Sequence, residues 1–484
     1  MARPSPAVEH LLRRAGFGAT PAEGEKFSRL TLPLAVASLV NYDPAATDVD
    51  AKIGTPGYVG HTIRNGAFTP NTSITDARQR WLFRMVHSPA PLQEKMALFW
   101  HHHFATAQSK IAGTTNGADA TRMMASKPSS DPTGMKGQIE LFREYALGNF
   151  RQLLIEVAKD PAMLYWLDGR LNVRNQPQEN FGRELMELFT IGVEHYLESD
   201  VLPAARVFTG WNLRVTGGAA VDHYAFNYNA NQHDANAKDF SFPIYANGSR
   251  RIEARSAATG MQDGLDLINA LAIHPETANR LARRLWTWFV SEVDPPDASF
   301  VSSIAQTYLK NDTNMKPVIR AVLLSTQFMD SRRYYQRYAW PVEFVVRSLK
   351  EVGHVGFSVD TALTPLLNMG QQLFEPPDVN GWETGPGWFS TGGMLARMNF
   401  ASVLATNQRF ALREASRTSG GTPDSLLTFV RGRLSLPVLA PSVESALIAY
   451  IQAGGTWTGS ETQLLNKTGG LFHLLTGSGE YQLV

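Results

Sequence analysis

Glu179–Leu188 is the segment of this sequence whose side chains are best suited to chemistry. At about 100° per residue, a helix places Asn180, Glu184 and Glu187 within an arc of about 60°, with Arg183 beside them. Two carboxylates held this close repel each other, so they must face water, pair with cations, share a proton or bind a metal ion. We therefore predict that the amide and the two carboxylates act as one unit.

Residues 101–103 are three consecutive histidines in a chain that has 12. If the preceding helix continues through them, His103 extends its apolar stripe and becomes buried, while His101 points about 200° away. If that helix ends before them and the chain becomes extended, His101 and His103 point the same way and can chelate a metal ion. Both alternatives stay open, and His102 is expected to face solvent.

A polar loop contributes a third group, His233-Asp234 followed by Lys238. Asp234 can orient the imidazole of His233 or bind a metal ion together with it. Lys238 can stabilise a negative charge that develops during a reaction. In the simpler interpretation, these are exposed loop residues with no chemical role.

The acidic helix and the histidine run also have structural interpretations. Arg183 and Glu187 have the (i, i+4) spacing of an ordinary helix ion pair, and a charged stripe is most often a solvated face. Arg170, Arg174 and Arg206 could pair with the two glutamates, and a buried arginine–glutamate lattice shifts pKa values without any reaction. A histidine on an apolar stripe is usually a satisfied core residue.

The elements that must position these groups are helices. The predicted helices cover residues 76–87, a stretch that starts at 91, and 139–147, 149–159, 262–274, 276–291, 297–310, 315–329 and 341–352. Gly169 is expected to end a further helix as its C-cap. The fold class is therefore all-α, with long irregular loops and a short β-hairpin near 214–260, a polar stretch rich in Gly and Asn. We expect a helical core over residues 1–412 and a C-terminal helical segment, 413–484, packed on it.

Composition excludes several classes of function. The net charge of +1 gives no global electrostatic case for binding nucleic acid, and the absence of cysteine excludes disulfides, thiolate nucleophiles and cysteine-ligated metal centres. No apolar run reaches the roughly 18 residues of a membrane span, so none is expected. The N-terminus lacks an apolar signal-peptide region, which predicts a cytoplasmic protein, or a periplasmic or exported one if a signal was removed.

Several separated motifs resemble a known family. They are His10–Gly18, Phe99–Phe104, Glu179–Gly192, Thr209-Gly210-Trp211, His233-Asp234 with Lys238, Asn380-Gly381-Trp382 and Glu480-Tyr481-Gln482. In this order they resemble DUF1800, a large family of bacterial proteins of unknown function. The resemblance runs nearly end to end and implies a predominantly helical fold.

The resemblance also implies a partner and a location. Similar proteins are often encoded beside a protein that looks like a sulfatase or alkaline phosphatase, and many carry an export signal, which this sequence lacks. Position 189 is Phe where many similar proteins have His, so a ligand role of that histidine is absent here.

Histidine and carboxylate side chains on helices lead to the main hypothesis, a metalloenzyme that holds one or two divalent ions of iron, manganese or zinc. The predicted ligands are His101, His103, Glu184, Glu187 and His233. Arg183 and Lys238 orient the substrate or stabilise charge, and Asn180 and Asp234 support the ligands. Oxidative chemistry is slightly favoured over hydrolysis by analogy with helical carboxylate-bridged sites.

Two other hypotheses remain. In the first, a metal-free hydrolase uses two carboxylates as general acid and base, with Asp168 as the distant acid because Glu184 and Glu187 are too close for an inverting mechanism. In the second, the chain is a non-catalytic assembly or export partner of a neighbouring enzyme, and the polar motifs form a buried scaffold. The test is whether the motifs converge on an open pocket or on a packed lattice.

Overall fold

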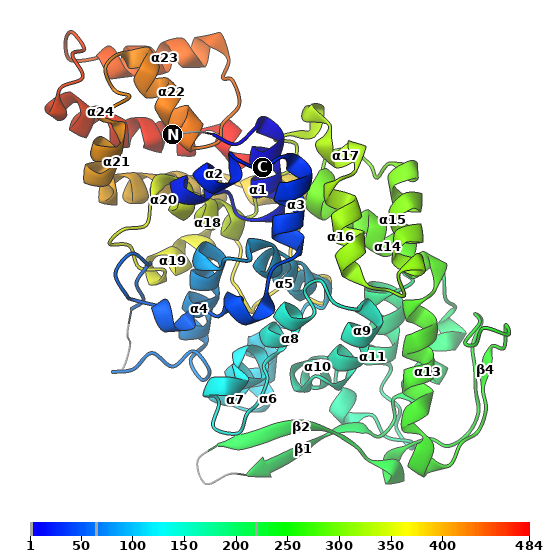
Figure 1. The fold of residues 1–484 in the computed structure, drawn as a ribbon. Helices are drawn as coiled ribbons and strands as arrows, with labels where there is room; N and C mark the ends of the chain where they lie inside the picture. The colour runs from blue at the N-terminus through cyan, green and yellow to red at the C-terminus, as the bar shows by residue number, and fades with distance from the viewer. Residues whose placement is uncertain (1–2, 63–65, 218–220) are drawn as a thin grey trace.

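The computed structural model of the protein describes residues 3–62, 66–217 and 221–484. It is mainly helical and has two small antiparallel strand pairs, which confirms the predicted fold class (Figure 1). Among these residues, no helix is both long enough and apolar enough to cross a membrane.

The described residues of the first part of the chain form helices and loops. Its helices are α1 (Pro6–Ala15), α2 (Pro21–Phe27), α3 (Leu32–Val40), α4 (Ile74–His87), α5 (Pro91–His103), α6 (Gln108–Thr114), α7 (Gly117–Ala125) and α8 (Gln138–Glu144). Helix α5 is buried along its whole length, against α1, α3, α4 and α8. A helix covered on every side is a core element, so its polar residues need partners inside the protein.

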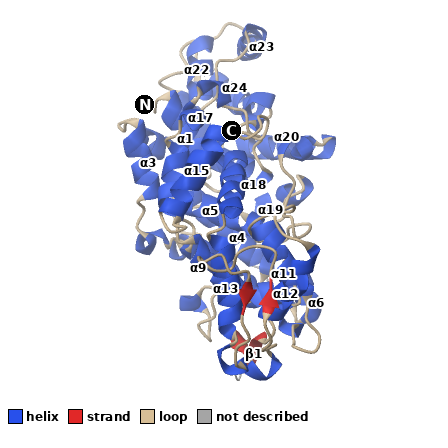
Figure 2. Cartoon of the chain, turned by 90° about the vertical axis from the view of Figure 1, so that its right-hand side faces the viewer, coloured by secondary structure: helices blue, strands red, loops and turns tan. Residues whose placement is uncertain are grey.

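The middle of the chain contains all the strands that the structure describes. Its elements are α9 (Phe150–Lys159), α10 (Pro161–Trp166), α11 (Glu179–Glu184), α12 (Val201–Val207), β1 (Trp211–Gly217), β2 (Asp222–Tyr228), β3 (Lys238–Asp239), β4 (Arg251–Ile252), α13 (Met261–Ala272) and α14 (Pro275–Leu285). Strands β1 and β2 form the predicted hairpin, with Trp211 opposite Tyr228. Both strand pairs lie at one end of the molecule (Figure 2).

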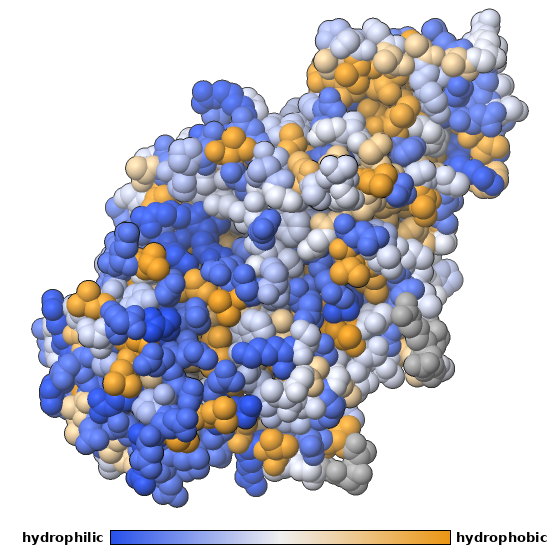
Figure 3. Space-filling model, turned by 180° about the vertical axis from the view of Figure 1, so that it is seen from behind, coloured by the Kyte–Doolittle hydropathy of each residue, from blue (hydrophilic) through white to orange (hydrophobic). Residues whose placement is uncertain are grey.

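The last part of the chain is again helical. It contains α15 (Ala298–Lys310), α16 (Met315–Leu323), α17 (Thr326–Met329), α18 (Pro341–Val352), α19 (Asp360–Asn368), α20 (Thr391–Asn407), α21 (Arg409–Ser416), α22 (Pro423–Arg433), α23 (Pro441–Gln452) and α24 (Glu461–Thr476). Helix α18 is buried throughout and packs against α4, α19 and α20. Helix α24 packs against α20, α21 and α22 at the end opposite the hairpin, where apolar side chains gather on the surface (Figure 3).

Buried ion pairs join α5 to the start of α18. Lys95 on α5 and Arg337 both bind the carboxylate of Glu343, and the Arg337–Glu343 distance is 2.7 Å. All three side chains are essentially inaccessible to solvent. Breaking one member of such a group leaves an uncompensated buried charge, so the network holds these helices in one arrangement.

The predicted C-cap at Gly169 is wrong. Helix α10 already ends at Trp166, and the left-handed residue is Asp168, with φ 59°. Asp tolerates this conformation better than most residues with a Cβ atom. Gly169 is instead limited by packing, because a Cβ atom there would lie 2.9 Å from Cδ2 of Leu164.

Candidate functional site

Helix α5 continues through the histidine run, so the first of the two alternatives for these residues holds. His103 is buried, and its Nε2 donates to the carbonyl oxygen of Phe189 at 3.1 Å. His101 lies among aromatic rings, with ring centroids 5.6 Å from Trp81 and 5.3 Å from Trp382. Burial lowers the pKa of His101 to about 3. Both rings therefore occupy an aromatic core and point away from each other.

The acidic segment is not one continuous α-helix. Helix α11 ends at Glu184, and residues Leu185–Phe189 form a π-helical turn, so the projection that grouped Asn180 with Glu187 does not apply beyond Glu184. The wider turn has more residues per revolution and rotates the later side chains. Burial and the charge of Glu187 raise the pKa of Glu184.

The charges on this segment have local partners. Arg183 binds Glu198 at 2.6 Å and Glu179 at 3.3 Å, in place of the (i, i+4) pair with Glu187. The Glu187 carboxylate accepts a hydrogen bond from the Tyr196 hydroxyl at 2.5 Å. Asn180 donates to Asp168 at 3.3 Å. The exception is Glu184, which has no hydrogen-bond or ion-pair partner among the described residues, so the strip is a partly solvated set in which the other groups are paired.

The third predicted group lies in a buried lattice. Nε2 of His233 is 3.3 Å from Asp263, and Lys238 binds the same carboxylate. Arg206 pairs with Asp234 at 2.7 Å, not with the glutamates of the acidic segment. Every charge in this group has a partner, as expected for a structural network.

The five predicted metal ligands do not come together. Among the residues that the structure describes, no three His, Asp or Glu side chains lie close enough to hold a metal ion. The ligands are divided between the aromatic core at α5, the end of α11 and the lattice around residue 233. The residues present do not fit one shared centre, and an iron, manganese or zinc site stays a prediction.

An open pocket lies beside the one histidine that was expected at the surface. It has a volume of about 530 Å³ and is bounded by α5, α14, residues 191–195 and the loop 380–384. His102 lines it but is only 8% exposed, so its expected exposure to solvent is wrong. Phe99, Trp288, Trp340 and Trp382 form nearly buried aromatic walls.

The loop 380–384 clamps His102. The backbone N–H of Trp382 donates to Nδ1 of His102 at 3.2 Å. Gly381 has φ 87°, and a Cβ atom there would lie 2.3 Å from the same nitrogen, so only glycine fits. No described residue is hydrogen-bonded to Nε2 of His102. Burial and the nearby Arg284 hold the pKa of His102 well below its usual range.

Three arginines from α14 make the pocket basic. Arg280, Arg283 and Arg284 have the (i, i+3, i+4) spacing of one helix face, and all three line the cavity. Nε and Nη2 of Arg280 donate to the carbonyl oxygen of Leu188 at 3.3 and 3.2 Å. Arg284 is half-buried, and its side chain forms no hydrogen bond or ion pair with any described residue. Burial and the charge of Arg280 lower the pKa of Arg284 to about 10.

The carboxylates that line the pocket do not neutralise these arginines. Glu292 accepts hydrogen bonds from the indole of Trp340 at 3.1 Å and from the backbone of Tyr338 at 3.2 Å. Glu383 lies exposed at the rim. His195, also exposed, faces Glu276 at 3.4 Å. The lining therefore has three arginines against two carboxylates, and Glu187, outside the lining, is the further carboxylate whose charge acts on Arg280.

Two π-helical turns meet at this pocket. Leu185–Phe189 supplies the carbonyl group that orients Arg280, and Trp286–Val290 extends α14 and supplies Trp288 to the wall. Such turns occur frequently at functional sites because they displace side chains from their regular positions. Nothing in the residue pattern of either segment predicted them.

Three of the sequence motifs supply walls of the pocket, but its positive charge was not predicted. The motifs Phe99–Phe104, Glu179–Gly192 and Asn380-Gly381-Trp382 all contribute to it. The spacing of the arginines at 280, 283 and 284 was visible in the sequence. Such a stripe is usually a solvated helix face, which is why the spacing alone carried no functional signal.

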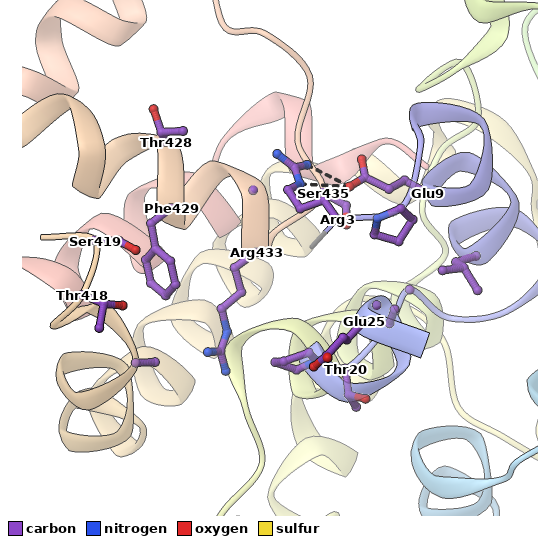
Figure 4. A pocket seen from close by; sticks show the side chains of 18 of the residues that line it. Arg3, Glu9, Thr20, Glu25, Thr418, Ser419, Thr428, Phe429, Arg433 and Ser435 are labelled. Atoms are coloured by element: carbon purple, nitrogen blue, oxygen red, sulfur yellow. Dashed lines mark hydrogen bonds and ion pairs between the residues drawn. The ribbon is translucent and has the colours of Figure 1, made fainter. Parts of the chain in front are cut away.

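A larger cavity of about 820 Å³ lies between helices α1, α2 and α22 (Figure 4). Two of its arginines already have partners within the protein. Arg3 binds Glu9 at 2.9 Å, and Arg433 donates to the carbonyl oxygen of Glu351 at 2.9 Å. This cavity offers less chemistry than the basic pocket.

Comparison with known proteins gives one match. The sequence profile of a family described as "Protein of unknown function (DUF1800)" matches residues 10–483. No curated protein and no solved structure matches the chain.

Proposed function

We propose that this chain, which belongs to the DUF1800 family, binds a small anionic molecule in the pocket beside His102. The observation that carries the proposal is Arg284, a half-buried guanidinium with no partner among the described residues. Partial removal of a charge from water is unfavourable when no counter-charge replaces the lost solvation. A bound anion would offset that cost.

The position of Arg280 supports the same conclusion. Its charge lowers the pKa of Arg284, so the two guanidinium groups are close enough to repel each other. Because Arg280 is held by the carbonyl group of Leu188, it cannot easily turn away. An anion bound near both guanidinium groups would attract each of them and offset their mutual repulsion. Guanidinium groups bind oxyanions well because their paired N–H groups donate to two oxygens.

The open pocket favours a small-molecule role over the purely structural scaffold considered for these motifs. Aromatic walls, a few polar groups and a concave shape are common to ligand sites. The pocket does not contain the predicted ligands Glu184, His103 or His233. The proposal therefore stands independently of a metal ion.

Isothermal titration calorimetry at low ionic strength tests the proposal. The probes are inorganic sulfate, inorganic phosphate and acetate, each titrated into the full chain. We expect at least one of them to bind, and Arg284→Gln to weaken that binding at least tenfold. Arg320→Gln is the matched control, because Arg320 is an exposed arginine on α16 that does not line the pocket.

Two results would overturn the proposal. One is that none of the three anions binds to the wild-type protein at millimolar concentrations. The other is that Arg284→Gln and Arg320→Gln bind the anion equally well. A thermal unfolding curve of each variant separates a lost site from a lost fold.

A further inference from the structure

We infer that the pocket recognises a tetrahedral oxyanion, a phosphate or sulfate group, and that Nε2–H of His102 donates a hydrogen bond to one of its oxygens. The inference rests on the proposed function and deepens it, since it names the ligand group and one specific donor. Its parts are the tautomer of His102, the loop that imposes this tautomer, and the balance of donors and acceptors in the pocket.

The tautomer follows from one hydrogen bond. The backbone amide of Trp382 has only a proton to offer, so Nδ1 of His102, 3.2 Å away, must be the acceptor. A neutral imidazole whose Nδ1 accepts carries its proton on Nε2. No described residue accepts that proton, although His102 is 92% buried by surface area. Because His102 lines the open pocket, this proton is available to an acceptor on a ligand.

The loop that imposes this tautomer approaches His102 closely through its backbone. Gly381 adopts a left-handed conformation that lets its backbone reach the imidazole ring, where any Cβ atom would collide. The ring of His102 also packs edge-on against Trp340, with centroids 5.0 Å apart. The backbone of Gly381-Trp382 and the indole of Trp340 thus both contact the imidazole of His102. These contacts limit rotation of the ring and so fix the direction of Nε2.

The balance of donors indicates the shape of the ligand. Arg284 offers its whole guanidinium, Arg280 retains Nη1, and His102 adds Nε2–H from a different helix. The buried carboxylate in the wall, Glu292, already accepts from Trp340 and from a backbone amide. A carboxylate ligand has two oxygens in one plane, whereas a tetrahedral oxyanion has three or four that point in different directions. Donors from α5 and α14 suit the second shape.

The first experiment compares ligand shapes. Sulfate, phosphate and acetate are titrated calorimetrically into the full chain at the same pH and ionic strength. We expect sulfate or phosphate to bind at least tenfold more tightly than acetate, and the two arms show which of the two groups is preferred. If acetate binds as tightly as both, the inference fails while the proposed function stands. If no anion binds, both fail.

The second experiment tests the histidine. His102→Leu removes the donor, whereas the amide of His102→Gln can accept from Trp382 and donate to the ligand. We expect His102→Leu to lose at least tenfold in affinity for the preferred oxyanion, and His102→Gln to stay within about threefold of the wild type. Equal losses in both variants, with unchanged thermal unfolding, would overturn the inference.

The third measurement is made on the wild-type chain, and a variant is needed only to assign the signals of His102. Long-range ¹H–¹⁵N correlation spectra of the wild-type chain at pH 7.5 report the tautomer of each histidine, and the signals missing from His102→Gln identify residue 102. We expect the pattern of a ring protonated on Nε2 alone. A ring protonated on Nδ1 would contradict the inference.

Discussion

The backbone amide of Trp382 donates to Nδ1 of His102 at 3.2 Å and so joins two motifs that lie 280 residues apart. The contact explains why a histidine run on a buried helix and a glycine–tryptophan pair in a loop belong to one site. The histidine that takes part is the middle one of the run, whose neighbours occupy the aromatic core. Arg284 from a third element completes the arrangement.

Substitution of Gly381 should disturb both stability and binding. In Gly381→Ala, the new Cβ atom meets the ring of His102 at 2.3 Å in addition to the strain of a positive φ. Gly385→Ala is the control, because Gly385 also has a positive φ, 73°, but no atom within 4 Å of an added Cβ. We expect about 1 kcal/mol of destabilisation for the control. Gly381→Ala should lose more and bind sulfate and phosphate at least tenfold more weakly. Urea unfolding and calorimetry measure the two effects, and equal behaviour of the variants would contradict the clamp.

Removing the carboxylate at Glu343 should destabilise the core strongly. Glu343 binds Lys95 and Arg337, and Glu343→Gln leaves these two buried cations with Glu292, 3.9 Å from Arg337, as their remaining counter-charge. We expect a loss of about 3–5 kcal/mol in the free energy of unfolding. Glu253→Gln breaks the exposed pair with Arg251 and should change the free energy of unfolding far less, because solvent screens this pair. Chemical denaturation measures both, and similar small losses would show that the buried network contributes little.

The buried Asp160 should make stability depend on pH. Burial raises its pKa to about 7, whereas in the unfolded chain an aspartate has a pKa near 3.9. The protonated carboxyl of Asp160 therefore contributes fully to the free energy of unfolding below about pH 4. This contribution is lost as the pH rises to about 7, because the unfolded chain releases the proton more readily.

Asp160→Asn should remove that dependence. Asparagine can still cap α10 at the amide of Met163 and accept from Gln138, so the hydrogen bonds at 3.1 and 2.7 Å keep an acceptor. We expect the variant to be more stable than the wild type at pH 8 by roughly 1–2 kcal/mol. Thermal unfolding at pH 5 and pH 8 measures the change. If Asp160→Asn is less stable than the wild type at pH 8, ionisation of the buried Asp160 carboxyl does not destabilise the folded protein.

A metal census tests the main hypothesis from the sequence. That hypothesis predicts at least one iron, manganese or zinc ion per chain, and a lower content in Glu184→Ala and His103→Ala. Because these side chains lie in separate surroundings, we expect neither substitution to change the metal content. Mass spectrometry of freshly purified protein measures it. Parallel loss in both variants would show that the two residues share an ion.

Much of the fold followed from periodicity. The predicted helix over 341–352 coincides with α18, and the hairpin predicted near 214–260 forms at 211–228. These features depend on local spacing, which a sequence displays directly. The acidic segment was different, because a single π-turn after Glu184 changed which side chains share a face. Such a turn depends on contacts from elsewhere, here the donation of Arg280 and His103 to carbonyl oxygens in that turn.

The sequence by itself determined the family, the helical class and the residues from which a site could be built. Only the tertiary structure decided which of those residues meet. Whether a polar side chain is a site or a scaffold depends on its partners, and the partners come from distant parts of the chain. The imidazole of His233 is paired with Asp263. The guanidinium of Arg284 instead lies near another cation, Arg280, and lines an open pocket. The spacing of residues in the sequence does not show this difference in pairing. Because of it, the candidate site lies at Arg280 and Arg284 and not at the carboxylates of Glu184 and Glu187.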